Sequence, residues 1–126
     1  MVDALPLALL LAACEAAPEP LPHAARPVVE IARWEVFDGD AHVGTVRQLE
    51  IHDPQGPQAF YRIEDRRGRW LGHATTAGRF TRRVPFRDEE QDLGVWSLAR
   101  GTALLVEAKA EVRLQPVALD ADMRRR

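Results

Sequence analysis

Residues Trp34–Gly44 read WEVFDGDAHVG, and the same pattern returns as YRIEDRRGRWLG over Tyr61–Gly72 and as VPFRDEEQDLG over Val84–Gly94. In each copy, aromatic and β-branched residues, which favour strands, lead to an aspartate that can hydrogen-bond to the backbone ahead of it. Each copy continues with a polar turn and ends with an apolar residue followed by glycine. The glycine follows the aspartate by six, seven and six positions in the three copies. Each copy therefore predicts a β-hairpin, with its glycine at a bulge or a close strand crossing.

Two further segments complete the expected sheet. Asp53–Pro57 (DPQGP) is a turn between an expected strand at His42–His52 and another at Gln58–Asp65. Leu104–Gln115 alternates apolar and polar residues with a period of two, which predicts a strand. A helix is the alternative for this segment, because alanine, glutamate and lysine favour helices and because apolar residues also recur in it every four positions.

The expected fold is all-β: a small antiparallel barrel or sandwich of about seven to eight strands, built from repeated hairpins over residues 28–119. A chain of this size can form a core without disulfides or metals. The residues expected in that core are Trp34, Val36, Ile51, Ile63, Val84, Phe86, Val106 and Val112.

The N-terminal end carries a different signal. An apolar run, Ala4–Ala13, ends at Cys14, the single cysteine of the chain. Ten residues make only about 15 Å of helix, half the ~30 Å hydrocarbon core of a bilayer, so the run is too short to span it. The motif Leu11-Ala12-Ala13-Cys14 resembles the lipobox of bacterial lipoproteins. This resemblance implies that residues 1–13 are a signal peptide and that Cys14 carries the lipid that holds the protein on the membrane.

Residues 14–27 are rich in alanine and proline and are expected to form a linker after the lipidated cysteine. The alternative is an Ala/Leu helix packed on the domain with Cys14 as a buried thiol, and Asp3, which stands where a signal peptide carries a basic residue, favours it. Pro18, Pro20 and Pro22 favour the linker, because a packed helix cannot continue through them. Residues 120–126 are expected to be a polar tail. Glu15, where an aspartate would retain a lipoprotein in the inner membrane, favours the periplasmic face of the outer membrane.

The charge is unevenly distributed. The net charge of −2 argues against nucleic-acid binding. Between Arg62 and Arg87, however, eight arginines stand against only Glu64 and Asp65. Because guanidinium groups bind phosphates and carboxylates bidentately, this region is a candidate surface for an anion or a partner. The alternative is that the arginines pair with the acidic run after Arg87. The candidate residues are Arg62, Arg66, Arg67, Arg69, Arg79, Arg82 and Arg83.

No residue pattern predicts catalysis. The single serine, Ser97, lacks the Gly-x-Ser-x-Gly elbow, and the four histidines lack metal-ligand spacing. We therefore expect no catalytic residue, no cofactor and no metal, and a protein that is not an enzyme. His42 and His73 on neighbouring strands are the one metal arrangement left open.

Together these features predict a membrane-anchored lipoprotein of the cell envelope. Its expected role is a binding or assembly module for an envelope protein or an anionic envelope component. One alternative is a lipid-anchored inhibitor of an envelope enzyme, which would present a protruding loop around Asp88–Asp92. The other is a small hydrolase, which would need a cleft containing at least two of His42, His73, Asp38 and Asp88.

Overall fold

The computed structural model describes residues 27–119. The lipobox with Cys14, nearly all of the linker and the tail at 120–126 lie outside the described residues. Within the described part, seven strands form one antiparallel sheet in the order β6-β5-β4-β3-β2-β1-β7, with one helix. These elements are β1 (Val28–Asp38), β2 (Ala41–Asp53), β3 (Gly56–Asp65), β4 (Trp70–Thr75), β5 (Arg79–Arg83), β6 (Glu90–Val95), α2 (Leu98–Leu105) and β7 (Arg113–Val117).

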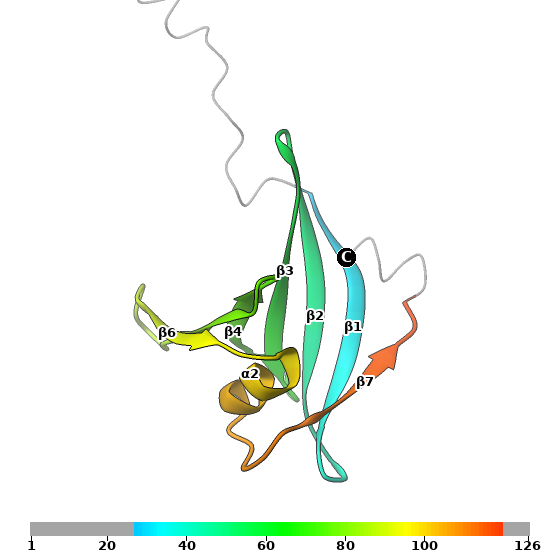
Figure 1. The fold of residues 1–126 in the computed structure, drawn as a ribbon, viewed down its shortest axis with the longest axis vertical. Helices are drawn as coiled ribbons and strands as arrows, with labels where there is room; N and C mark the ends of the chain where they lie inside the picture. The colour runs from blue at the N-terminus through cyan, green and yellow to red at the C-terminus, as the bar shows by residue number, and fades with distance from the viewer. Residues whose placement is uncertain (1–26, 120–126) are drawn as a thin grey trace, which may run out of the picture.

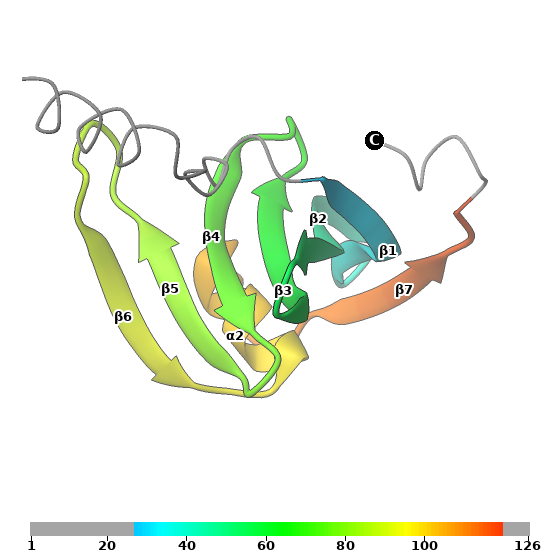
Figure 2. The same ribbon diagram turned by 90° about the horizontal axis from the view of Figure 1, so that it is seen from above.

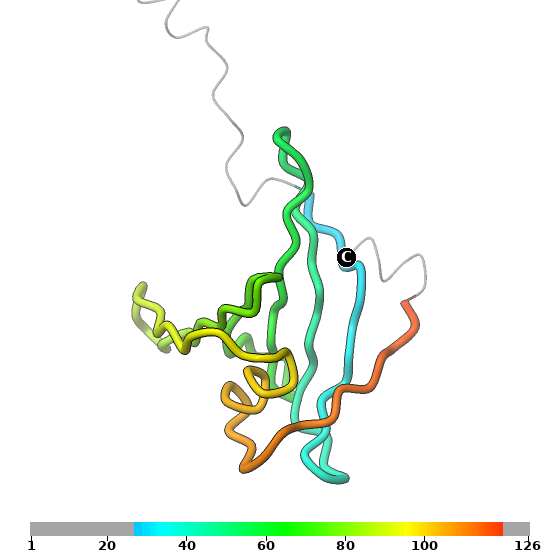
Figure 3. Tube along the Cα trace, in the orientation of Figure 1, coloured from blue at the N-terminus to red at the C-terminus, as the bar shows by residue number. Residues whose placement is uncertain are grey.

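The sheet is an open, curved meander. Each of the strands β1 to β5 pairs with the strand that follows it in the chain. After β6 the chain passes through α2 to the opposite edge, where β7 pairs with β1. The sheet curls around α2, which lies on its concave side (Figures 1 and 2), and the tube in Figure 3 follows the crossing from β6 to β7. The predicted all-β class is confirmed, although β6 and β7 do not pair and the sheet stays open.

The first two predicted hairpins form as expected. The third forms between β5 and β6, but its predicted first strand, Val84–Asp88, is wrong, because these residues make the turn and Arg79–Arg83 is the strand. Each of the three hairpins contains a register shift at its apolar-glycine pair. The skipped residues are Val43, Leu71 and Leu93, each directly before the glycine of its repeat. At Gly72 the neighbouring strand is so close that a β-carbon would lie 2.2 Å from the Thr81 carbonyl oxygen. The glycines therefore permit the bulges and close crossings that bend the sheet around the helix.

The core lies between the concave face of the sheet and α2. Side chains from β1 to β5 meet residues from α2 and the segment before β7. The buried apolar residues of this core are Val36, Val46, Ile63, Ala74, Phe80, Ala103, Leu105 and Val112. Each large apolar side chain buried in this way contributes about 1.5–3 kcal/mol.

Four of the predicted core residues are buried: Val36, Ile51, Ile63 and Val112. Three others, Trp34, Val84 and Val106, are half-buried. The prediction for Phe86 is wrong, because its side chain is fully exposed at 108%. Phe86 lies in the turn between β5 and β6 rather than in a strand, so its backbone does not direct it toward the core.

The predicted strand at Leu104–Gln115 is also wrong over most of its length. Leu104 and Leu105 end α2, and a strand begins only at Arg113. The helix starts because Ser97 caps it, its hydroxyl accepting a hydrogen bond from the Arg100 N–H at 3.2 Å. The helix ends with a C-terminal capping turn, in which the Ala108 N–H donates to the Ala103 carbonyl at 2.9 Å. Glu107, just before Ala108, has the left-handed φ of +59° that such turns use.

Candidate functional site

The convex face of the sheet carries a cross-strand row of arginines. Arg33 on β1 lies opposite Arg47 on β2, which lies opposite Arg62 on β3. Trp34, next to Arg33 in the chain, and Val46, next to Arg47, face the core. Because side chains alternate between the two faces of a strand, the arginine row faces away from the core. Like charges placed directly opposite each other are destabilising, so the row needs acidic partners.

Two buried glutamates supply that compensation. Glu30 accepts hydrogen bonds from the guanidinium groups of Arg33, at 2.8 Å, and Arg47, at 3.0 Å. Glu64 accepts from Arg47 at 3.0 Å and lies 2.9 Å from Nε of Arg62. Charge thus alternates along five side chains from β1 to β3, and the network ties these strands together on the face opposite the core.

Glu30 is the most buried charge of this network, with 1% of its surface exposed. Burial alone would raise the pKa of its carboxyl group, but the hydrogen bond from Arg33 and the charges of Arg47 and Arg33 outweigh burial, so the pKa lies below its ordinary value. The carboxylate is therefore ionised at neutral pH. Of the five residues in this network, only Arg62 is among the candidate residues that the sequence suggested. The sequence signal for the network is Glu30, a charged residue between the apolar residues Val29 and Ile31 of a strand.

Arg66, Arg67 and Arg69 lie in the turn between β3 and β4. Asp65 organises this turn by accepting hydrogen bonds from the backbone N–H groups of Arg67 and Arg69, both at 2.9 Å. The side chain of Arg69 pairs with Asp65 at 2.8 Å. Arg66 and Arg67 are exposed, and neither side chain makes an ion pair with a residue in the described range 27–119.

Two further candidate arginines enclose Trp70. The guanidinium carbon of Arg62 lies 4.9 Å from the ring centroid and that of Arg83 lies 4.2 Å from it, so both make cation–π contacts. The indole N–H donates to the Gly72 carbonyl at 2.8 Å, which holds the ring in place. This stack lies at the β4 end nearest the Asp65–Arg69 turn.

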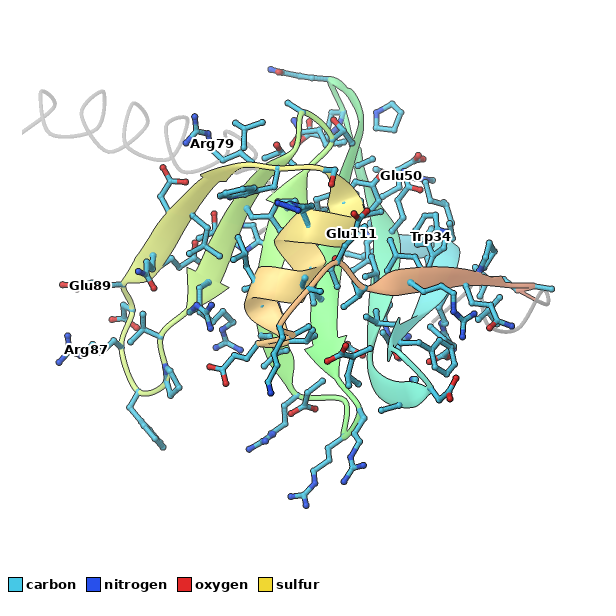
Figure 4. All side chains as sticks on the ribbon, turned by 60° about the horizontal axis from the view of Figure 1, so that its bottom comes forward. Trp34, Glu50, Arg79, Arg87, Glu89 and Glu111 are labelled. Carbon is cyan, nitrogen blue, oxygen red and sulfur yellow. The ribbon has the colours of Figure 1, made fainter. Side chains whose placement is uncertain are left out.

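The remaining candidates, Arg79 and Arg82, lie apart from that turn. Arg79 pairs with Asp92 on the neighbouring strand at 2.7 Å, and Figure 4 shows it at the opposite end of the β5–β6 hairpin from Arg87 and Glu89. Arg82 points to the concave side, where it donates to the Leu104 carbonyl at 2.8 Å. The seven arginines are therefore divided among the convex face, one turn and the concave side.

The histidines that could form a metal pair are separated. His42 on β2 contacts Glu35, while His73 on β4 lies 3.7 Å from Glu90, and β3 runs between their strands. Within residues 27–119, no three His, Cys, Asp or Glu side chains gather in a way that would hold a metal ion. His42 and Asp88 also line different pockets.

The concave side carries an apolar pocket of about 240 Å³ beside α2. Trp96 and Leu104 are its largest apolar walls and remain 41% and 39% exposed. The Trp96 ring is fixed by a hydrogen bond from its indole N–H to the Leu93 carbonyl at 2.6 Å. The sequence motifs did not indicate this pocket, because it forms only where the helix meets the segment before β7.

The exposed arginine turn lies far from the point where the chain enters the sheet. Val28 pairs with Ile51 at one end of β1, whereas Asp38 pairs with Ala41 at the other end. The Asp65 end of β3 pairs with Gly44, so it lies beside that second end. Eleven residues of strand separate the two ends by about 33 Å.

No family model, curated protein or solved structure matches this chain. In the described range, no helix is long and apolar enough to cross a membrane.

Proposed function

We propose that this protein is a lipid-anchored binding or assembly module of the bacterial cell envelope. The motif Leu11-Ala12-Ala13-Cys14 and the proline-rich residues after it support the anchor. The exposed pair Arg66 and Arg67 supports the binding role, since neither is neutralised by an acid in the described part of the chain. This pair is the single observation on which the binding surface rests.

The position of the pair favours a partner that lies beyond the bilayer. A chain tethered through Cys14 enters the domain at Val28. Arg66 and Arg67 follow Asp65, which lies level with Val36, eight residues and about 26 Å further along β1. Lipid headgroups directly beneath the tether are therefore a poorer match than an acidic envelope protein or an anionic envelope polymer. The nearby Arg62–Trp70–Arg83 stack adds a planar surface with two guanidinium groups.

The binding surface can be tested with the full chain in detergent and two probes, polyglutamate as an acidic polymer and vesicles rich in phosphatidylglycerol. We expect polyglutamate binding that weakens as salt rises, because exposed charges are screened within about 8 Å at physiological salt. The double variant Arg66→Glu with Arg67→Glu should lose this binding. Arg66→Lys with Arg67→Lys, which keeps both positive charges at the same positions, is the matched control and should retain most of the binding. Equal binding by parent and double variant at low salt would refute the proposal.

The anchor has its own test. Mass spectrometry of the protein from native membranes should find a lipid on Cys14, and Cys14→Ala should release the protein from the membrane fraction. An unmodified thiol in the membrane fraction would contradict the anchor without bearing on the arginine surface.

A lipid-anchored inhibitor of an envelope enzyme is the second candidate. It requires a protruding loop, and the turn between β5 and β6, in which residues 85–89 are all exposed, supports this candidate. Asp88 and Glu89 belong to this turn, while Asp92 belongs to β6. The aromatic residue of the turn, Phe86, is fully exposed.

A further inference from the structure

Phe86 occupies a position that ordinary turn chemistry does not favour. The Arg87 N–H donates to the Val84 carbonyl at 3.3 Å, so Val84–Arg87 is a β-turn with Pro85 and Phe86 as its central residues. The φ angle of Phe86 is +62°, in the left-handed region that glycine or asparagine fills in turns of this type. The ring is also fully exposed. A non-glycine residue held in this backbone region costs stability, and such residues cluster at sites of binding and function.

The concave pocket beside α2 matches such a ring in size and polarity. Its volume is about 240 Å³, and Trp96, Ala103, Leu104 and Ala108 contribute apolar surface. A cavity of roughly 150 Å³ lined by apolar side chains accepts benzene, so a phenyl ring fits this pocket. Aromatic anchors that insert into pockets of this kind dominate the energetics of many interfaces.

The net charges around the ring and the pocket are opposite in sign. Phe86 is followed by exposed Arg87 and then by the exposed acids Asp88, Glu89 and Glu90, so acids outnumber the cation. Arg100 and Lys109 line the pocket together with one acid, Glu111. Such complementarity sets the orientation of docking and disfavours other partners.

The ring and the pocket of one molecule do not meet. Phe86 is fully exposed, so it contacts no pocket of its own chain. Figure 4 shows Arg87 and Glu89 at the tip of the β5–β6 hairpin, well away from Glu111 beside the helix. We propose that the Phe86 turn of one copy docks in the Trp96–Leu104 pocket of a second copy of this chain. This self-association uses a surface different from the arginine turn and goes beyond the proposed function.

The acidic residues also argue against a bilayer as the occupant. An anionic membrane surface would repel Asp88, Glu89 and Glu90 while attracting only Arg87 and its basic neighbours. A protein pocket with basic residues at its rim can bury the Phe86 ring and pair with the acidic residues beside it. The pocket of this chain, with Arg100 and Lys109, is of that kind.

Photo-crosslinking of the full chain in cells tests the contact. Phe86→p-benzoylphenylalanine should give, on irradiation, an adduct of twice the mass, with the crosslinked peptide within residues 96–111. Adding Leu104→Glu, which places a charge in the pocket wall, should lower the yield at least about tenfold. The same crosslinker at Phe37, whose ring is covered by Arg113, is the matched control and should give no such adduct.

A charge exchange provides a second readout that does not depend on Leu104. Arg100→Glu with Lys109→Glu should reduce the adduct, and Asp88→Arg with Glu89→Arg added to the same chain should restore it, because the pairing is then reversed. The absence of an adduct, an adduct with another protein or a lipid, or a crosslink outside residues 96–111 would overturn the self-association. A yield unaffected by both Leu104→Glu and the charge reversal would overturn it as well.

Discussion

Gly101 of α2 lies directly against the ring of Phe80 on β5, so closely that a β-carbon at Gly101 would be 2.3 Å from Cε1 of Phe80. Gly101 and Phe80 are both buried, and Phe80 is among the largest buried side chains. This contact sets how near the helix approaches the sheet, and the helix in turn covers the concave core.

Replacing Gly101 by alanine should therefore destabilise the protein. Alanine favours a helix over glycine by about 1 kcal/mol, but overpacking against the buried Phe80 ring costs typically 1–3 kcal/mol, so we expect a net loss. Thermal unfolding monitored by circular dichroism measures this loss. Ala99→Gly in the same helix isolates the effect of helix propensity, and a Gly101→Ala variant as stable as the parent would show that the helix can move away from the sheet.

The stability of the network around Glu30 should depend on pH. The pKa of the Glu30 carboxyl group in the folded protein lies below its ordinary value of 4.5. The ionised carboxylate therefore stabilises the fold in full at pH values above 4.5. As the pH falls below about 4.5 and through the lower folded-state pKa, this contribution is lost. The melting temperature should therefore fall on acidification, and Glu30→Gln should remove part of this dependence.

At neutral pH, Glu30→Gln should also lower the free energy of unfolding by about 3 kcal/mol, because it leaves partly buried arginines without their anionic partner. Chemical denaturation measures this change. Glu89→Gln is the matched control, since Glu89 is exposed and should change stability by less than about 0.5 kcal/mol. Equal losses in the two variants would contradict a special role for Glu30.

Thr102 offers a stabilising substitution. Its side chain is fully buried in α2, and its hydroxyl has no hydrogen-bond partner within the described residues. Thr102→Val keeps the shape and removes the unpaired hydroxyl, so it should raise the free energy of unfolding by about 1 kcal/mol. Thr102→Ser, which keeps the hydroxyl and loses a methyl group, should be less stable than the parent. A destabilised valine variant would indicate that the hydroxyl is satisfied in solution.

Phe86→Gly should stabilise the domain, because glycine adopts a φ of +62° without strain. We expect a gain of about 1 kcal/mol, detectable as a higher melting temperature in a dilute sample of the full chain. Phe86→Ala removes the ring but keeps a β-carbon, so the backbone strain at this φ remains and this gain should be absent. If alanine and glycine stabilise equally, exposure of the ring rather than backbone strain is the source of the cost.

Part of the candidate site follows from the sequence. The Asp65 turn with Arg66, Arg67 and Arg69 is a local structure, and the aspartate accepts the backbone hydrogen bonds that the repeat predicts. The partners of the other arginines are not local. Arg79 pairs with Asp92, and Arg82 reaches the Leu104 carbonyl, through contacts between segments that only the folded chain brings together.

The sequence by itself determined the all-β class, the first two hairpins with their turns, and the glycine positions at which the three hairpins bend. These features depend on interactions over a few residues: a turn needs its aspartate, and a bulge with a close crossing needs its glycine, as at Gly44 and Gly72. The apolar-glycine pair was informative because it marks a backbone requirement rather than a side-chain preference.

Only the tertiary structure decided that α2, rather than a continuous strand, follows β6. Alternation over Leu104–Gln115 predicts a strand, but a helix begins earlier, at the Ser97 cap, and takes in Leu104 and Leu105, because Ala103 and Leu105 are buried against the sheet. The tertiary structure likewise placed Glu30 among arginines and left Phe86 exposed at a turn. Such outcomes arise from contacts between residues distant in the chain, where burial and charge pairing outweigh local propensity.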